Sequence, residues 1–158
     1  MAGKSTALAD RFDMEIERAV ATLEGLSDAD WHKVTAAEGW PVGVTAHHFA
    51  GALGPISQLI EGLVAGRPGA LSRPALDAMN AQHAKDHADC TKAETIALLR
   101  QGAAVASSTI RGLTDAQLAK SGTVLTDVPQ TTVEQLIDAA LFSHIAEHFG
   151  SIRATVGR

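Results

Sequence analysis

Apolar residues recur every three to four positions along most of this chain, and this spacing limits its fold more than any other feature. One stripe of the segment from about residue 5 to residue 26 carries Leu8, Phe12, Ile16 and Leu23. Such a stripe is the buried face of an amphipathic helix. Alternating β-branched runs, which would indicate strands, are scarce. The spacing therefore predicts an all-α chain.

Proline and glycine predict the bounds of a second helix. Pro41 suits a first helical turn, because the N–H that proline lacks has no partner there. The helix is expected to reach about residue 65, with a bend at Pro55, which cannot donate the usual backbone hydrogen bond. The stretch "AGRPGALSRPA" over 65–75 is a loop by its composition.

Two capping-box patterns organise the rest of the chain. A third helical stretch starts near residue 74, and the pair Thr91 and Glu94 indicates a restart or kink after residue 89 before it continues to residue 111. Thr131 and Glu134 repeat the pattern and open a last helix that reaches about residue 156. Four long helices predict an antiparallel four-helix bundle, with residues 1–158 as one domain.

Charge and cysteine content exclude several classes of function. The 158 residues carry a net charge of −5, and their lysines and arginines are scattered singly. This pattern argues against a nucleic-acid-binding surface and against a polybasic membrane signal. No apolar run approaches the roughly 20 residues of a spanning helix, and the N-terminus lacks the apolar core of a secretory signal. Cys90 is the only cysteine, so a cytoplasmic protein without an internal disulfide is expected.

Two adjacent histidines in the second predicted helix must point in different directions, because neighbouring helical residues diverge by about 100°. Steps of three and four from His48 meet only apolar residues, whereas the same steps from His47 meet small and polar ones. His48 is therefore expected to face the interior of the bundle. His47 is expected to lie at the edge of the bundle or in solvent.

The last predicted helix contains "LFSHIAEHFGSI", which places His144 and His148 one turn apart on an inward stripe. Buried imidazoles need hydrogen-bonding or metal partners. A divalent cation would satisfy both rings, and His48 would complete a three-histidine set with open positions. The alternative is that these rings are hydrogen-bonded residues of the core and that any metal is adventitious. Glu147 lies off this face, and is at most an outer partner of a ring.

A second histidine pair occurs in "NAQHAKDHADC", where His83 and His87 share the same spacing. Asn80 lies one turn before His83, and Cys90 follows three residues after His87. This group could form a second metal set or line the same cavity as the first. A nucleophilic Cys90–His87 pair is disfavoured, because the sequence identifies nothing that would activate the thiol.

The motifs around these histidines resemble those of the DinB/YfiT-like superfamily of metal-binding four-helix bundles. Trp40 stands eight residues before His48 in "GWPVGVTAHHFAG", and "HIAEHFGSI" supplies the late pair. The resemblance covers nearly the whole chain and implies that His48, His144 and His148 bind a divalent metal, zinc or nickel. Many relatives have a second histidine and a glutamine where this chain has Phe149 and Ser151.

The resemblance implies an enzyme that activates a thiol or water on a three-histidine metal. Relatives include mycothiol-dependent maleylpyruvate isomerases, bacillithiol S-transferases and hydrolases, so thiol S-transfer or isomerisation with mycothiol or bacillithiol is the predicted chemistry. His83, His87 and Asn80 are then candidate substrate-side or proton-shuttling groups. The alternatives are a metal-dependent hydrolase, and a non-catalytic, stress-related metal-binding bundle that acts through dimerisation.

The last predicted helix is apolar on more than one side, so it needs cover from more than its own bundle. A homodimer is therefore expected, with Phe142, Ile145 or Phe149 in the interface.

Overall fold

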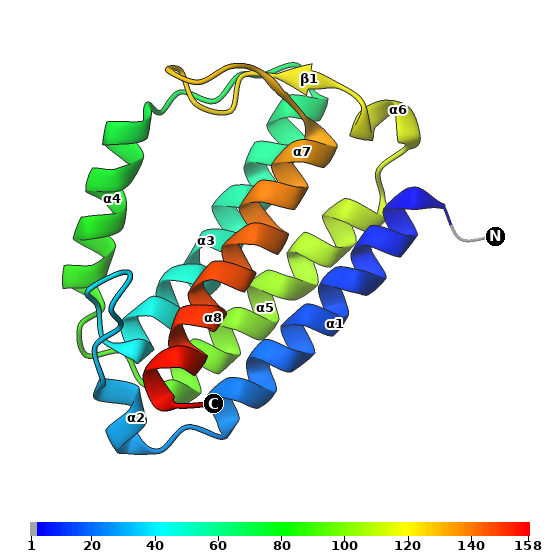
Figure 1. The fold of residues 1–158 in the computed structure, drawn as a ribbon. Helices are drawn as coiled ribbons and strands as arrows, with labels where there is room; N and C mark the ends of the chain where they lie inside the picture. The colour runs from blue at the N-terminus through cyan, green and yellow to red at the C-terminus, as the bar shows by residue number, and fades with distance from the viewer. Residues whose placement is uncertain (1–2) are drawn as a thin grey trace.

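The computed structural model describes residues 3–158, and almost all of its regular structure is helical (Figure 1). In chain order the elements are α1 (Lys4–Glu24), α2 (Asp28–His32), α3 (Val42–Val64), α4 (Arg73–Asp86), α5 (Lys92–Arg111), α6 (Asp115–Leu118), β1 (Ser121–Gly122), β2 (Thr131–Thr132), α7 (Val133–Ile137), η1 (Asp138–Ser143) and α8 (His144–Val156). The elements α7, η1 and α8 follow one another without a break and form the last long helix. The predicted all-α four-helix bundle is confirmed.

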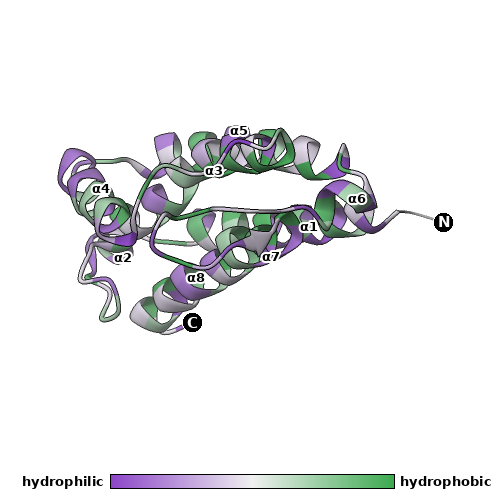
Figure 2. Ribbon diagram, turned by 90° about the horizontal axis from the view of Figure 1, so that it is seen from above, coloured by the Kyte–Doolittle hydropathy of each residue, from purple (hydrophilic) through white to green (hydrophobic). Residues whose placement is uncertain are grey.

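The four long helices form two layers, with α3 and α5 in one and α1 and the last helix in the other (Figure 2). α1 and α5 are antiparallel, since Arg111 at the end of α5 forms ion pairs with Asp10 and Asp13 near the start of α1. The predicted antiparallel arrangement does not extend to α3 and α5, which run in the same direction, because Thr109 near the end of α5 bonds to Glu61 near the end of α3. This parallel pair is possible because α4 carries the chain back outside the bundle.

The core lies between the two layers. Its largest fully buried side chains come from each long helix, and they include Phe12, Phe49, Leu53, Ile110 and Phe149.

The side chains expected in a dimer interface belong to this core. Phe142, Ile145 and Phe149 are 5%, 4% and 2% exposed within a single chain. Phe142 packs edge-on against Phe12 of α1, and Phe149 packs edge-on against Phe49 of α3. The prediction that these residues form an interface is therefore wrong, because the chain's own helices cover the apolar sides of the last helix. The homodimer stays a prediction without an assigned interface.

The capping boxes define where the later helices begin. Thr91 and Glu94 cap α5 as predicted, but the chain reverses there, so α4 and α5 are separate helices. The last helix is capped by Thr132 and Gln135, one residue later than expected. Both threonines belong to the short β1–β2 ladder, where Thr131 pairs with Gly122 and Thr132 with Ser121, and the helix begins directly after the second of them.

α4 is unlike the other long helices, because none of its residues is buried. It lies beside α3, away from the two layers of the bundle (Figures 1 and 2). The side chain of Ser72 caps its start, and the Asp127 side chain accepts a hydrogen bond from the Arg73 backbone N–H. Across residues 3–158, each helix is either too short or too polar to cross a lipid bilayer.

Candidate metal centre

Three histidine rings from two antiparallel helices converge beside the core. His48 comes from α3, and His144 and His148 lie one turn apart on α8. One nitrogen of each ring lies within 4.8 Å of the corresponding nitrogens of the other two. The Nε2 atoms of His48 and His144 are 3.2 Å apart, close to the separation of about 3.3 Å between two nitrogens bound at 2.0–2.1 Å to a tetrahedral zinc ion. His48 is 7% exposed, so it faces inward as expected.

Hydrogen bonds fix the orientation of both rings on α8. Nδ1 of His144 lies 3.1 Å from the carbonyl oxygen of Ala140, and Nδ1 of His148 lies 2.8 Å from Oε1 of Glu38. Both partners are acceptors, so each Nδ1 carries the proton and donates. Each Nε2 is therefore unprotonated and carries a lone pair, and that of His144 faces Nε2 of His48. This is the arrangement in which a protein presents histidine to a metal ion.

Glu38 reaches α8 from the tight loop that joins α2 to α3. The loop closes through a backbone bond from Thr35 N–H to the carbonyl of Trp40, and it turns at Gly39, whose φ is 70°. Glycine adopts this left-handed conformation without the steric cost that a Cβ would add. The turn points Glu38 toward the last helix, where Ser151 donates a hydrogen bond to its Oε2 over 2.7 Å.

The Glu38 carboxylate is ionised despite its partial burial. Burial alone would raise its pKa, but hydrogen bonds from Ser151, Thr35 and His148 outweigh this effect and lower the pKa below its usual value. Glu147, the acidic residue that the sequence offered as an outer partner, is exposed. Sequence reasoning missed Glu38, although it immediately precedes the motif that contains Trp40.

The two more buried rings of the set are neutral at physiological pH. Burial, reinforced by the neighbouring histidines, lowers the pKa of His48 to about 3 and that of His144 to about 4. Trp40 packs edge-on against His48, and Phe49 packs edge-on against His144, with ring centroids 5.2 and 5.1 Å apart. Neutral, tightly packed imidazoles offer lone pairs in fixed directions. Such nitrogen donors suit borderline cations such as Zn²⁺ and Ni²⁺, and these residues fit a cation of that class.

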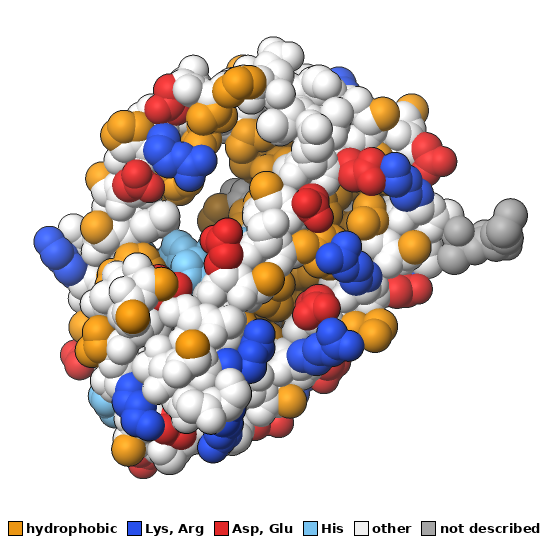
Figure 3. All heavy atoms as spheres, in the orientation of Figure 1, with side chains coloured by type: hydrophobic (Ala, Val, Ile, Leu, Met, Phe, Trp, Pro, Cys, Tyr) orange, Lys and Arg blue, Asp and Glu red, His pale blue; other side chains and the backbone are white. Residues whose placement is uncertain are grey.

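The surface is hollowed between α4 and the last helix, and histidine side chains are visible in this hollow (Figure 3). A small molecule can therefore approach the histidine-rich region from the side that α4 borders.

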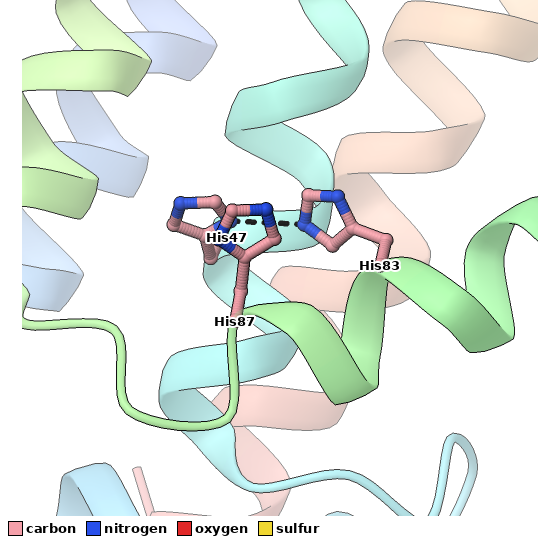
Figure 4. A group of neighbouring side chains, drawn as sticks. All are labelled: His47, His83 and His87. Carbon is pink, nitrogen blue, oxygen red and sulfur yellow. Dashed lines mark hydrogen bonds between the residues drawn. The ribbon is translucent and has the colours of Figure 1, made fainter.

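A second group of three histidines lies next to the first. One ring nitrogen of each of His47, His83 and His87 lies within 4.8 Å of the others. Figure 4 shows His47 facing His83 of α4 and His87, which directly follows that helix. His47 lies at the edge of the two-layer bundle, which was one of the two expected positions, but the alternative that it lies in solvent is wrong. It is 9% exposed, because α4 packs over its side of α3.

The remaining residues that the sequence singled out lie on or after α4. Asn80 lies one turn before His83 on that helix. Cys90 is half-buried, and burial raises its pKa. A thiol with a raised pKa is a poor nucleophile, which agrees with the rejection of a catalytic Cys90–His87 pair.

Replacing Glu38 with glutamine should weaken metal binding at the first set by about 10–100-fold, the usual effect of losing an outer partner of a ligating histidine. The amide can still accept the His148 N–H bond, but it removes the negative charge that makes the ring a stronger donor. Titration with Zn²⁺ measures the change. The matched control is Glu147→Gln, which removes an exposed carboxylate from the same helix as His148 and should leave the affinity unchanged. Equal affinities for both variants would contradict this role of Glu38.

Comparisons with known proteins agree with this geometry. Residues 12–151 match the mycothiol maleylpyruvate isomerase N-terminal domain family. A solved structure of YfiT from Bacillus subtilis, described as "a probable metal-dependent hydrolase with an unusual four-helix bundle topology", superposes with a TM-score of 0.70. The two chains are 20% identical, and the similarity covers 94% of this chain and 87% of that one. No curated protein matches the sequence.

The YfiT comparison supports the fold, and the family match covers most of the chain. Both agree with the resemblance to YfiT-like proteins that the histidine motifs indicated. The chain belongs to the mycothiol maleylpyruvate isomerase N-terminal domain family.

Proposed function

We propose that this protein is a divalent-metal-dependent enzyme in which His48, His144 and His148 hold the cation, and that its reaction is thiol S-transfer or isomerisation. The observation that carries this proposal is that one ring nitrogen of each of His48, His144 and His148 converges within 4.8 Å, while hydrogen bonds hold Nδ1 of both rings on α8. Hydrogen-bonded histidines of a core would also need these acceptors, but one nitrogen of each ring would not then have to converge with those of the other two, as it does here.

When bound, a cation held by three neutral imidazoles would lower the pKa of a thiol or water molecule that it ligates, so that a strong nucleophile is available near neutral pH. The protein's own groups prepare this chemistry. The Glu38 carboxylate keeps the His148 proton on Nδ1, and the Ala140 carbonyl does the same for His144. Trp40 restricts the His48 ring from one side.

The proposed thiol is mycothiol or bacillithiol, and the proposed metal is zinc or nickel. The family name supports a low-molecular-weight thiol, and the neutral donor set supports a borderline metal. The hollow between α4 and the last helix offers space for such a substrate.

The test is metal-dependent conjugation of mycothiol or bacillithiol to a model electrophile, together with isomerisation of maleylpyruvate in the presence of mycothiol. We expect activity that EDTA removes, that Zn²⁺ or Ni²⁺ restores, and that is lost in His148→Ala. The control His32→Ala removes an exposed histidine from α2 and should retain full activity. Activity that is indifferent to EDTA or unchanged in His148→Ala would overturn the mechanism.

A second candidate is hydrolysis, and it is favoured by the description of YfiT as a probable metal-dependent hydrolase. The two functions separate in a single experiment with activated ester and amide substrates. Turnover that requires the metal but no thiol would identify the hydrolase. Metal binding without turnover in either assay would instead support the non-catalytic metal-binding bundle.

A further inference from the structure

The helix α4 lacks the apolar face that normally holds a helix to its neighbours. None of its residues is buried, so little hydrophobic free energy can fix its position. Its C-terminal end nevertheless lies against α3. Imidazole rings meet there, with His83 of α4 and His87, the residue after its end, facing His47 of α3 (Figure 4).

The sequence of α3 makes room for this contact. A Cβ at Gly51 would lie only 3.1 Å from Cε1 of His83, which is closer than ordinary packing allows. The absence of a side chain at Gly51, one turn after His47, therefore lets the His83 ring reach α3. Gly54, in the next turn, has no such neighbour.

The three rings are arranged as a donor set. Nδ1 of His47 and Nε2 of His83 are 2.9 Å apart, and His87 stacks on His47 with ring centroids separated by 4.2 Å. All three donor nitrogens lie within 4.8 Å of one another, as they do in the first set. Asp86 and Glu94 lie close enough to act electrostatically on these rings, and their charge favours a cation.

We propose that His47, His83 and His87 form a second binding site for a borderline divalent cation such as Zn²⁺, and that this cation fastens α4 to α3. The second site does not depend on the first for its ligands. The two are nevertheless neighbours, because His47 and His48 are adjacent in the chain and the ring of His83 lies 5.9 Å from that of His48. The fastened helix borders the hollow through which a substrate would approach the first site.

The number of zinc ions bound per chain tests the proposal. We expect metal-free wild-type protein, titrated with Zn²⁺ and then analysed for metal content, to bind two ions per chain. His87→Ala and His144→Ala should each bind one, and the double variant should bind none. His32→Ala, the control, should bind two. Circular dichroism identifies any variant that fails to fold, and His83→Ala then replaces His87→Ala.

Other stoichiometries would overturn the second site. If the wild-type protein and His87→Ala each bind one ion, there is no metal site between α3 and α4. One ion lost in both single variants would mean that the six rings share one cation. Loss of the ion only in His144→Ala would leave the proposed function intact, so the two proposals fail independently.

Hydrogen exchange tests whether the cation fastens α4. If opening of α4 requires release of the ion, Zn²⁺ at 100 times its Kd should slow exchange of the α4 amides by up to about 100-fold. We expect this slowing in wild-type protein and in His144→Ala, but not in His87→Ala. Two bound ions with unchanged exchange in α4 would overturn the fastening role.

Discussion

Replacing His144 with alanine should raise the Kd for Zn²⁺ at the first site by at least about 100-fold. Loss of a hydrogen-bonding partner of a ligand lowers metal affinity by about 10–100-fold. This variant loses a ligand itself, so the loss of affinity should be at least as large. His144 supplies the Nε2 atom that lies 3.2 Å from that of His48, on the side of its ring opposite the Ala140 carbonyl. Isothermal titration with Zn²⁺ measures the change when His144→Ala is added to His87→Ala, a variant in which only the first site remains.

The same substitution should change the thermal stability that zinc confers. A ligand at 100 times its Kd stabilises a folded protein by about 2.7 kcal/mol, whereas the same concentration at a site weakened 100-fold gives about 0.4 kcal/mol. For a chain of this length, the difference between these two free energies corresponds to about 5–10 °C in Tm. Zinc should therefore raise the Tm of His144→Ala by about 5–10 °C less than it raises that of the wild type. His32→Ala should keep the full rise. A zinc-dependent rise in Tm that is equal in both variants would show that His144 is not a ligand.

Helical periodicity placed His48, His144 and His148 on inward faces, the family resemblance implied the same set, and the structure brings the three rings together. Counting in steps of three and four placed His48 on the inward face of α3, and the i, i+4 spacing placed the other two on one face of α8. Periodicity worked because each helix is amphipathic, so its buried face is determined by its own residues. The capping box at Thr91 and Glu94 was visible for a similar reason, since its hydrogen bonds are local.

The same reasoning could not predict contacts between segments that are far apart in the sequence. Glu38 contacts His148 over 110 residues of sequence, through a loop whose shape depends on Gly39 and on pairing between Val34 and Pro41. His47 was expected at the edge of the bundle or in solvent, because nothing in α3 shows that α4 will cover it. The π-helical segment η1, just before His144, also went unpredicted, because periodicity counts assume regular α-helical turns.

Two of these residues, Glu38 and His47, lie at the N-terminal half of α3, the first just before it and the second within it. Every residue from Val42 to Ala50 is buried, because this half-helix contacts α5, the last helix, α4 and α2 on its different sides. A helix enclosed in this way cannot be described by one inward face. It can, however, present two adjacent histidines to two different neighbours, which is how His47 and His48 come to belong to separate sets.

The same enclosure predicts a large loss of stability from a small change at the start of α3. A Cβ at Gly43 would overlap the indole ring of Trp31, which is 6% exposed and donates an Nε1–H hydrogen bond to the carbonyl of Cys90 over 2.9 Å. In Gly43→Ala the indole must move, so its packing and this bond are both disturbed. Overpacking costs about 1–3 kcal/mol, and an unmade buried hydrogen bond costs about 1–3 kcal/mol more.

Alanine favours a helix over glycine by about 1 kcal/mol, which offsets part of this cost. We therefore expect Gly43→Ala to lower the free energy of unfolding by about 2–4 kcal/mol, as measured by urea denaturation of the metal-free protein. Gly54→Ala is the matched control in the same helix, because a Cβ there meets no atom within 4 Å. It should raise the free energy of unfolding by about 0.5–1 kcal/mol. Similar changes in both variants would mean that Trp31 of α2 does not pack against Gly43 of α3 as it does in the structure.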